Sequence, residues 1–258
     1  MDDVWYGKYW NPQLPALQPQ VGEALLVGRQ PEELLPRLTD APRMLTSEEE
    51  MENGYGLCRD GSMVVAVNTD MPDVTPAMWD WWFGWHSDDS RRYRLWHPRA
   101  HMFAGWADPD TDTTGRSDRE RYIGRTSFVD EYLGAERNEL AIRFLAPGEL
   151  GFDESLLATD TAIAARGGFS GVPLDAGYLV HHVREVPGGS QMRSRFWLGG
   201  SHVSARGQQI ADPALRVVAR TALRRTEEQA RALLVHCAHE MSHLATFLPT
   251  LFAEAREA

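Results

Sequence analysis

Residues 177–200 have the sequence GYLVHHVREVPGGSQMRSRFWLGG, in which two strand-like runs flank Pro187-Gly188-Gly189-Ser190. Adjacent Pro and Gly residues are strong turn formers, so the stretch predicts a β-hairpin. Strands that a tight turn joins are antiparallel. The hairpin therefore points to an antiparallel sheet.

Further β patterns precede this hairpin, and together they extend from residue 121 to about residue 203. RYIGRTSFVDEYLG (121–134) and ELAIRFLAP (139–147) are two strand-like runs separated by the turn-like AERN (135–138). Earlier in the chain, Arg59-Asp60-Gly61-Ser62 has turn chemistry between two strand-like runs within residues 55–72, which predicts another hairpin.

The last fifty residues have a helical pattern. Asp212-Pro213 is expected to begin one helix by cap and proline rules. Thr226, followed three residues later by Gln229, forms a capping box for a second helix, which should run to about residue 248, before Pro249. A meandering antiparallel sheet followed by a long helix predicts an α+β fold with the sheet wrapped around that helix.

The N-terminal part has a different character. Residues 1 to about 45 are rich in Pro, with short apolar pieces that suggest short helices and extended arms. Thr75 and Pro76 fit the start of a short aromatic helix that should end near Gly84. We therefore divide the chain into an N-terminal extension over residues 1–75, with short helices and a hairpin, and a domain over residues 76–258.

Composition limits the classes of partner. The 258 residues carry a formal net charge of −11, which argues against nucleic acid and anionic membrane surfaces. No apolar run approaches the ~20 residues of a membrane span, and no signal-peptide pattern is visible. Cys58 and Cys237 are too few for a disulfide framework. These features predict a cytoplasmic protein.

The run LLVHCAHEMSHLATF, residues 233–247, places histidines and a glutamate in an apolar part of the C-terminal helix. At 100° per residue, His236 and Glu240 lie one turn apart on the apolar face, while His239 lies toward the polar side and His243 at the margin. A carboxylate in an apolar face is costly unless it is paired or binds a metal. His236 and Glu240 are therefore candidate metal ligands.

The same run also matches the H-E-x-x-H pattern of zinc proteases, through His239, Glu240 and His243. That pattern needs a third ligand, usually well downstream. Only fifteen residues follow His243, and none of them is His. The polar position of His239 also disfavours the protease hypothesis, which is the weaker alternative.

Further ligands must come from other parts of the chain. LWHPRAH offers His97 and His101. SFVDEYLG offers Asp130 and Glu131, of which only one can face the core because side chains alternate along a strand. His86, which follows a tryptophan cluster, is another candidate.

Five motifs together resemble the diacetylphloroglucinol hydrolase family, to which phloretin hydrolase is related. They are WDWWFGWH, RRYRLWHPRAH, VDEYLG, MRSRFWLGG and HCAHEM, and the resemblance covers residues from about 75 to 250. It implies an enzyme that hydrolyses the carbon–carbon bond between an acyl group and a polyhydroxylated aromatic ring. It also implies a helix-grip fold like that of the birch-pollen-allergen superfamily, and a homodimer formed through the N-terminal part.

The resemblance further implies one zinc ion bound by two His and two Glu. Matched by motif, these ligands are His101, Glu131, His236 and Glu240, which agrees with the pair chosen from the helix geometry. Nitrogen and oxygen ligands also suit other divalent transition metals.

The resemblance also bears on the substrate. Tyr93 matches a tyrosine that hydrogen-bonds a substrate oxygen. An amide side chain is expected shortly after the metal-binding His, but this chain has Ala104 there. The substrate is therefore expected to be an acylated phenol or related ketone whose exact structure stays open.

Cleavage requires a proton for the departing ring carbon, and His182 is the candidate carrier. His181 is equally plausible until the orientation of the strand is known. Trp82 and Trp197 are candidate substrate contacts, although core packing explains tryptophans equally well. The alternative to an enzyme is a helix-grip protein that binds a small molecule without a metal and leaves it intact.

Overall fold

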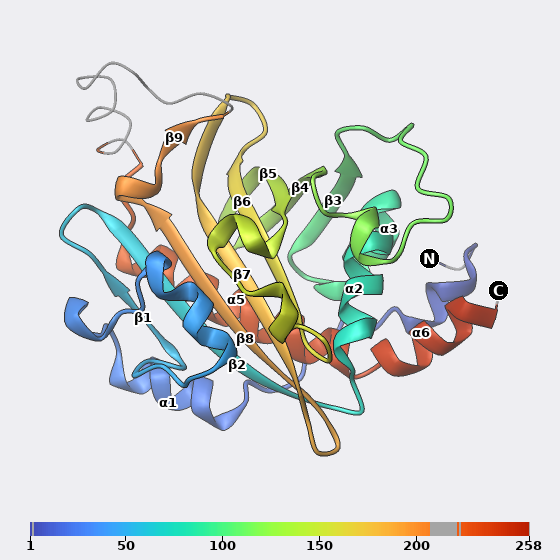
Figure 1. Cartoon of the computed structure of the whole chain (residues 1–258), viewed down its shortest axis with the longest axis horizontal. Coiled ribbons are helices and arrows are strands. Elements are labelled where there is room, and N and C mark those ends of the chain that lie inside the picture. The colour runs from blue at the N-terminus through green and yellow to red at the C-terminus, as the bar shows by residue number, and fades with distance from the viewer. Residues whose placement is uncertain (2, 207–220, 222, 258) are drawn as a thin grey trace.

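The computed structural model describes residues 1, 3–206, 221 and 223–257. The strands in these residues form one antiparallel sheet in the order β1-β2-β8-β7-β6-β5-β4-β3, with β9 paired to β7 (Figure 1). Their bounds are β1 (Gly54–Leu57), β2 (Ser62–Pro72), β3 (His101–Trp106), β4 (Thr126–Leu133), β5 (Glu136–Leu145), β6 (Thr161–Phe169), β7 (Leu174–Val186), β8 (Gly189–Gly199) and β9 (Ser204–Ala205).

The helices lie mainly at the two ends of the chain and between β2 and β3. The described α-helices are α1 (Pro19–Val27), α2 (Pro76–Trp85), α3 (Ser90–Trp96), α5 (Glu227–Ala245) and α6 (Leu248–Glu257). The described 3-10 helices are η1 (Trp5–Tyr9), η2 (Glu32–Leu34), η3 (Leu38–Leu45), η4 (His86–Asp88), η5 (Arg119–Arg121), η6 (Pro147–Leu150), η7 (Glu154–Leu156) and η8 (Gly200–His202). Among the described helices, none combines the length and the apolar character that crossing a membrane requires.

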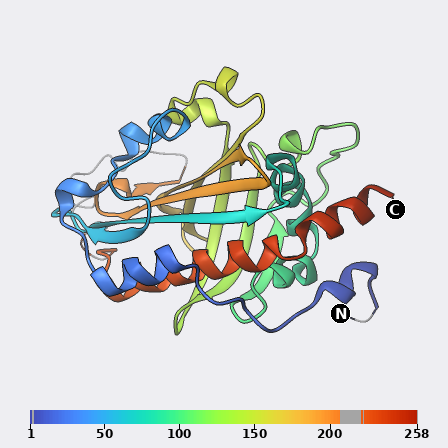
Figure 2. The ribbon, with the colours of Figure 1, turned by 90° about the horizontal axis from the view of Figure 1, so that it is seen from below.

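Helix α5 is the helix around which the sheet curves. It runs along one face of the sheet with α1 beside it (Figure 2). The capping box predicted at its start is present, with the Thr226 side chain accepting a hydrogen bond from the Gln229 backbone. The α+β helix-grip arrangement expected from the sequence is therefore confirmed.

The ends of the predicted helices differ in detail from the structure. Helix α2 is capped by Thr75 as expected, and it ends at Trp85, one residue beyond the expected end. Helix α5 ends at Ala245, and α6 begins at Leu248 with Pro249 in its first turn, where proline is tolerated. The helix predicted from Asp212-Pro213 lies outside the described residues.

Strand β2 contradicts the division of the chain at residues 75 and 76. It pairs with β8 along its whole length, from Ser62 opposite Gly199 to Pro72 opposite Gly189. The β1–β2 hairpin was expected, but its partner strand was not, and the proposed boundary cuts through a single sheet. Homodimerisation through the N-terminal part stays a prediction.

Both faces of the sheet are covered. On β2, Val65 belongs to the core that includes α5, while Val64 on the opposite face belongs to a second core. Met44 of η3 and Leu35 pack in that second core. Coverage on both sides explains why β2 is a nearly continuous apolar run rather than an alternating one.

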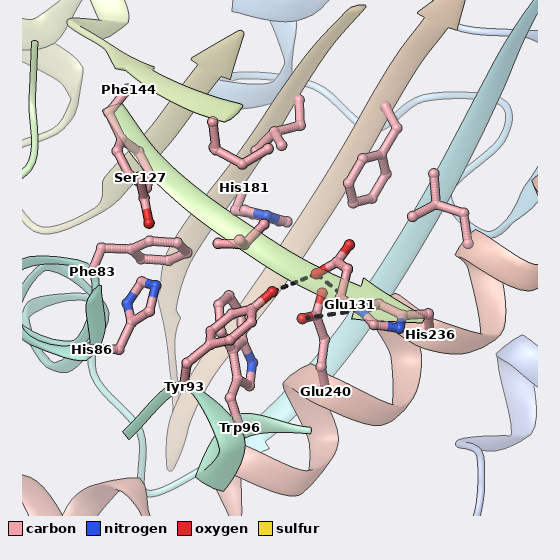
Figure 3. A pocket seen from close by; sticks show the side chains of 15 residues that line it. Phe83, His86, Tyr93, Trp96, Ser127, Glu131, Phe144, His181, His236 and Glu240 are labelled. Carbon is pink, nitrogen blue, oxygen red and sulfur yellow. Dashed lines mark hydrogen bonds and ion pairs between the residues drawn. The ribbon is translucent and has the colours of Figure 1, made fainter. Parts of the chain in front are cut away.

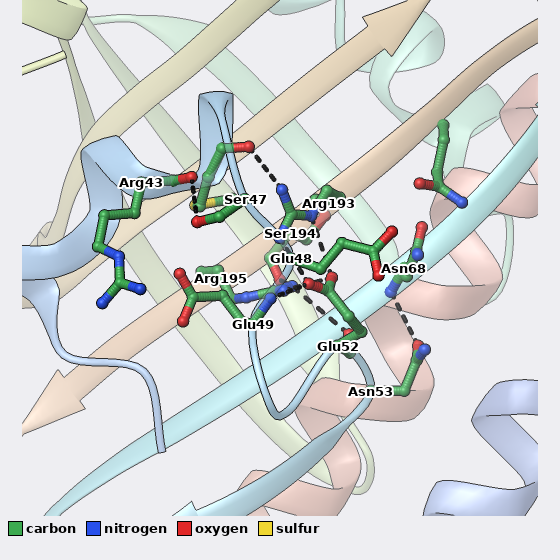
Figure 4. A network of polar contacts seen from close by, with 12 residues as sticks. Arg43, Ser47, Glu48, Glu49, Glu52, Asn53, Asn68, Arg193, Ser194 and Arg195 are labelled. Atoms are coloured by element: carbon green, nitrogen blue, oxygen red, sulfur yellow. Dashed lines mark hydrogen bonds and ion pairs between the residues drawn. The ribbon is translucent and has the colours of Figure 1, made fainter. Parts of the chain in front are cut away.

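A buried ionic network fastens the N-terminal segment to the outer face, which is the face opposite α5 (Figure 4). Arg193 and Arg195 of β8 are fully buried and both donate to the carboxylate of Glu52, with Nη2–Oε distances of 2.5 and 2.6 Å. Arg193 also donates from Nη1 to the Met44 carbonyl at 2.5 Å. The network therefore joins η3 and the segment before β1 to the middle of the sheet.

Candidate metal centre and active site

Three elements bring two histidines and two glutamates together on the inner face of the sheet, and Figure 3 shows Glu131, His236 and Glu240 of this group. His101 begins β3 and lies directly opposite Glu131 of β4 in the strand register. His236 and Glu240 come from one face of α5, where their spacing of four residues places them one turn apart. The structure therefore brings together all four ligands implied by the motifs.

The ligand atoms of these four residues converge. His101 Nε2 lies 3.3 Å from His236 Nε2, 3.4 Å from Glu240 Oε2 and 3.7 Å from Glu131 Oε2. His236 Nε2 lies 3.7 Å from Glu240 Oε2 and 4.0 Å from Glu131 Oε2. Donor atoms about 2.0–2.2 Å from a tetrahedral ion such as zinc would be separated by roughly 3.4 Å. The cluster is therefore compatible with one metal ion.

The hydrogen bond of His101 orients its free nitrogen toward this cluster. Its Nδ1 lies 3.0 Å from the carbonyl oxygen of Tyr93, which can only accept, so Nδ1 carries the proton. Nε2 is then a lone-pair acceptor that faces His236 Nε2 and two carboxylates. Acceptors that face one another favour a cation or a shared proton between them. A hydrogen bond from the other ring nitrogen to a backbone carbonyl, as His101 makes to Tyr93, is the usual way in which a metal-binding histidine is oriented.

Burial moves all four groups toward their neutral forms. It lowers the pKa of His101 well below its ordinary value and that of His236 to about 4. It raises the pKa of Glu131 to about 7 and holds that of Glu240 well above its ordinary value. The imidazoles therefore keep free lone pairs at neutral pH, and a bound cation would favour the ionised carboxylates.

Tyr93 of α3 positions this cluster. Its ring stacks on the His101 ring, with centroids 3.8 Å apart and parallel planes, and its hydroxyl donates a hydrogen bond to Glu131 Oε2. Burial and the neighbouring Glu131 charge raise the pKa of Tyr93 well above its ordinary value. The hydroxyl therefore keeps its proton, and it faces both Glu131 and the adjoining cavity.

A cavity extends from the metal cluster along the inner face of the sheet, and we call it the ring cavity. Its aromatic walls are Phe83, Trp96 and Phe144. Its polar lining residues are His86, Tyr93, Ser127, Glu131, His181, His236 and Glu240. The cavity thus combines flat apolar walls with hydrogen-bonding groups at both ends.

A directed chain of hydrogen bonds ends at Ser127, far along β4 from Glu131. His86 is neutral because burial lowers its pKa to about 4, and its Nδ1 donates to the Trp82 carbonyl at 2.9 Å. His86 Nε2 must then accept from Ser87 Oγ at 3.1 Å, and Ser87 Oγ accepts from Ser127 Oγ at 2.8 Å. Ser127 therefore offers lone pairs to a hydroxyl in the ring cavity.

The chain was compared with known proteins. Residues 34–253 match the family model described as the DAPG hydrolase PhiG domain. The chain belongs to the DAPG hydrolase family. The resemblance inferred from the five motifs, and the expectation of a hydrolase with it, are therefore confirmed.

Relatives in this family match most of the chain. The 2,4-diacetylphloroglucinol hydrolase of a Pseudomonas species is 31% identical over an alignment 233 residues long, which covers 86% of this chain and 78% of the relative. The phloretin hydrolase of Eubacterium ramulus is 29% identical over an alignment 272 residues long, gaps included, which covers 98% of this chain and 90% of the relative.

Among solved structures, that of Ara h 8.0201 aligns with 70% of this chain and 99% of its own, at 12% identity and a TM-score of 0.34. The fold of this DAPG hydrolase family member is defined by its own strand order and by the enclosed helix α5.

Strand orientation decides between the two adjacent histidines of β7. His181 lines the ring cavity, with Nδ1 2.7 Å from Ser194 Oγ. His182 points to the outer face, where its Nε2 lies 3.1 Å from Asp160 Oδ2. The structure therefore contradicts His182 as the group that faces the site and places His181 there.

The two tryptophans expected to contact substrate lie elsewhere in this family member. Trp197 is on the outer face of β8, and its indole nitrogen donates to the Pro36 carbonyl at 2.8 Å. Trp82 is fully buried behind His86, on which its ring stacks. Phe83, next to Trp82 on α2, lines the cavity instead.

Of the H-E-x-x-H residues, only Glu240 lies in the cluster. His243 is buried with its ring nitrogens 3.1 and 3.2 Å from the carbonyl oxygens of Asn11 and Trp96. His239 lines a surface hollow next to the cluster, which His97 and His236 also line. The His97 ring stacks on His236 at a centroid distance of 4.8 Å, so it supports a candidate ligand.

Sequence reasoning missed Ser127. The alternation along β4 could have indicated it, because Ser127, Val129 and Glu131 share one face of the strand.

Proposed function

We propose that this protein is a zinc-dependent hydrolase that cleaves the carbon–carbon bond between an acyl group and a polyhydroxylated aromatic ring. The convergence of His101, Glu131, His236 and Glu240 at one end of an aromatic cavity carries this proposal. The names of the relatives support the substrate class, because they are hydrolases of 2,4-diacetylphloroglucinol and of phloretin. The substrate is a small aromatic ketone, and one product is a carboxylic acid.

The reaction needs an electrophilic acyl carbon and a ring carbon that accepts an electron pair. Hydrolysis transfers the oxygen of water to the acyl carbon, while the pair of the broken bond goes to the ring carbon, which takes up a proton. A ring with oxygens in a 1,3 arrangement stabilises this pair as an enolate. A zinc ion held by the four ligands would polarise the acyl carbonyl or lower the pKa of water to roughly 7.

The chain's own residues orient the ring. Tyr93 donates its one hydroxyl proton to Glu131, so its oxygen can accept a hydrogen bond from a substrate hydroxyl beside the acyl group, at the metal end of the cavity. Ser127 is oriented to accept from a ring hydroxyl at the other end. Two ring hydroxyls at opposite positions could therefore be recognised by two acceptors.

His181 is the proton carrier that the geometry supports. Burial lowers its pKa to about 3, so the ring is neutral and holds one proton. When Nδ1 donates its proton to Ser194 Oγ, Nε2 keeps a free lone pair. Nε2 could then take up the proton that water releases when its oxygen bonds to the acyl carbon, and pass that proton to the ring carbon as the carbon–carbon bond breaks.

The test is incubation of the zinc-loaded protein with acylphloroglucinols, with the products identified by mass. We expect a deacylated ring and the corresponding carboxylic acid in equal amounts. A ligand that binds stoichiometrically and is recovered intact would instead establish a binding protein of the same fold. In that case, metal analysis of the purified protein should also find no stoichiometric transition metal.

A further inference from the structure

A second cavity continues the ring cavity along the inner face of the sheet. The two cavities share five lining residues, which are Glu131, Ile142, Leu179, Phe196 and Leu233. Beyond these, the second cavity is lined mainly by aliphatic side chains and glycines, among them Leu140, Gly167, Ala176 and Leu198. The site therefore has two lobes that meet at a common waist.

The order of residues along each element shows that the lobes are arranged end to end. On β5, Phe144 lines the ring cavity, Ile142 lines both cavities, and Leu140 lines the second. On β4 the same order is Val129, Glu131 and Leu133. Although β4 and β5 are antiparallel, each strand has residues of the ring cavity toward one end and residues of the second cavity toward the other.

The waist coincides with the candidate metal centre. Glu131 is the one polar residue among the five shared lining residues. His236 and Glu240, which converge with it on His101, line the ring cavity beside this waist. A bond that is broken at the metal centre would therefore have one fragment in each lobe.

The two lobes differ in chemistry. The ring cavity has aromatic walls and hydrogen-bonding groups suited to a hydroxylated ring. The second lobe is mainly aliphatic, and its polar lining residues besides Glu131 are Glu136, Asn138, Arg225 and Gln229. We propose that this second lobe binds the acyl chain, and that the preferred substrates carry an apolar acyl group longer than acetyl.

The extent of the apolar lining sets the scale of the chain. Four strands contribute apolar residues to the second lobe, which are Leu133, Leu140, Ala176 and Leu198. An acetyl group is too small to contact all of them. A longer apolar chain such as octanoyl would bury more apolar surface, and each added methylene would strengthen binding.

This inference rests on the proposed function, but binding can test it separately. Sodium octanoate and sodium acetate would be titrated into the zinc-loaded protein by calorimetry, beside kcat/KM for octanoyl- and acetylphloroglucinol. We expect octanoate to bind at least about tenfold more tightly than acetate, and the octanoyl ketone to be preferred by a similar factor.

Two substitutions from different strands would fill the lobe, Leu140→Trp on β5 and Ala176→Leu on β7. Each should reduce the preference for the long chain at least about fivefold. Arg143→Trp is the matched control, because it adds similar bulk to β5 at a position that lines neither cavity. The control should keep the preference, and thermal unfolding would verify that all three variants fold.

The outcomes separate the two proposals. Equal binding of octanoate and acetate, or a preference that both folded lobe variants retain, would overturn the acyl lobe. If neither lobe variant folds, the wild-type preference alone decides. Tight octanoate binding without hydrolysis of either ketone would support the lobe and contradict the hydrolase.

Discussion

A difference of three residues on α5 separates a candidate metal ligand from a histidine outside the cluster. His236 Nε2 lies 3.3 Å from His101 Nε2, whereas His239 lines only the neighbouring surface hollow. We therefore expect His236→Ala to lose stoichiometric metal and His239→Ala to retain it, as measured by elemental analysis after gel filtration. Metal lost from the His239 variant alone would restore the H-E-x-x-H hypothesis.

The neighbouring histidines of β7 form a natural pair of test and control. His181→Gln removes the proton carrier that faces the ring cavity and should lower kcat by about 100-fold or more. His182→Gln changes the adjacent residue on the outer face and should leave kcat within about threefold. Steady-state kinetics on an acylphloroglucinol, at matched metal content, would measure both. Equal losses would show that His181 has no special role.

The position of Ser127 predicts that the enzyme prefers substrates with a ring hydroxyl opposite the acyl group. Ser127→Ala should lower kcat/KM about 3- to 10-fold for a substrate with a hydroxyl opposite the acyl group, because one hydrogen bond is lost. The same variant should change kcat/KM little for the analogue without that hydroxyl. A double-mutant cycle over the two proteins and two substrates isolates the contact, and a coupling of zero would exclude it.

At the residue scale, local periodicity determined what the sequence could predict. His236 and Glu240 were identified because helix geometry is set by the helix itself. The orientation of His181 was not predictable, since it depends on which face of the strand packs against α5. Trp197 was misassigned, although the alternation along β8 places it on the same face as Arg193 and Arg195 and could have indicated that it points away from the site.

At the scale of the elements, the ion pairs of Glu52 with Arg193 and Arg195 hold the segment before β1 against β8. Burial opposes ionisation of Glu52, but the hydrogen bond from Arg193 and the charge of Arg195 outweigh it and lower the pKa of Glu52 to about 2. The unfolded value is near 4.5. Ionised Glu52 therefore stabilises the fold fully above about pH 4.5, and this contribution is lost as the pH falls toward 2.

Glu52→Gln should accordingly reduce the free energy of unfolding by about 2–3 kcal/mol at pH 7. The difference from the wild type should stay constant down to pH 5 and narrow below pH 4.5, as measured by urea unfolding. Glu50→Gln, at an exposed position of the same segment, is the control and should behave like the wild type. A gap that widened in acid would contradict the assigned ion pairs.

The elements themselves were largely predictable, while their partners were not. Turn residues identified the β1–β2 and β7–β8 hairpins because each turn is local in sequence. The pairing of β2 with β8 joins segments that no turn connects, so the sequence placed the β1–β2 hairpin in a separate extension. The family resemblance, rather than periodicity, supplied His101 and Glu131.

On the scale of the whole molecule, the candidate metal centre joins residues of the sheet to residues of its enclosed helix. His101 and Glu131 come from β3 and β4, and His236 and Glu240 from α5. Zinc at about 100 times its Kd should add about 2.7 kcal/mol to the stability of the metal-free protein and raise its Tm by several degrees. Glu240→Gln should weaken this shift, and an equal shift in the variant would argue against Glu240 as a ligand.

The pairing of β2 with β8 also has a consequence for synthesis. Pro72 pairs with Gly189, which follows it by more than a hundred residues, so β8 leaves the ribosome roughly 5–25 seconds after β2. During this interval β2 exposes apolar residues on both faces, because β8, its partner toward the middle of the sheet, has not yet been synthesised. The β1–β2 hairpin of the nascent chain is therefore a segment on which we expect chaperones to act.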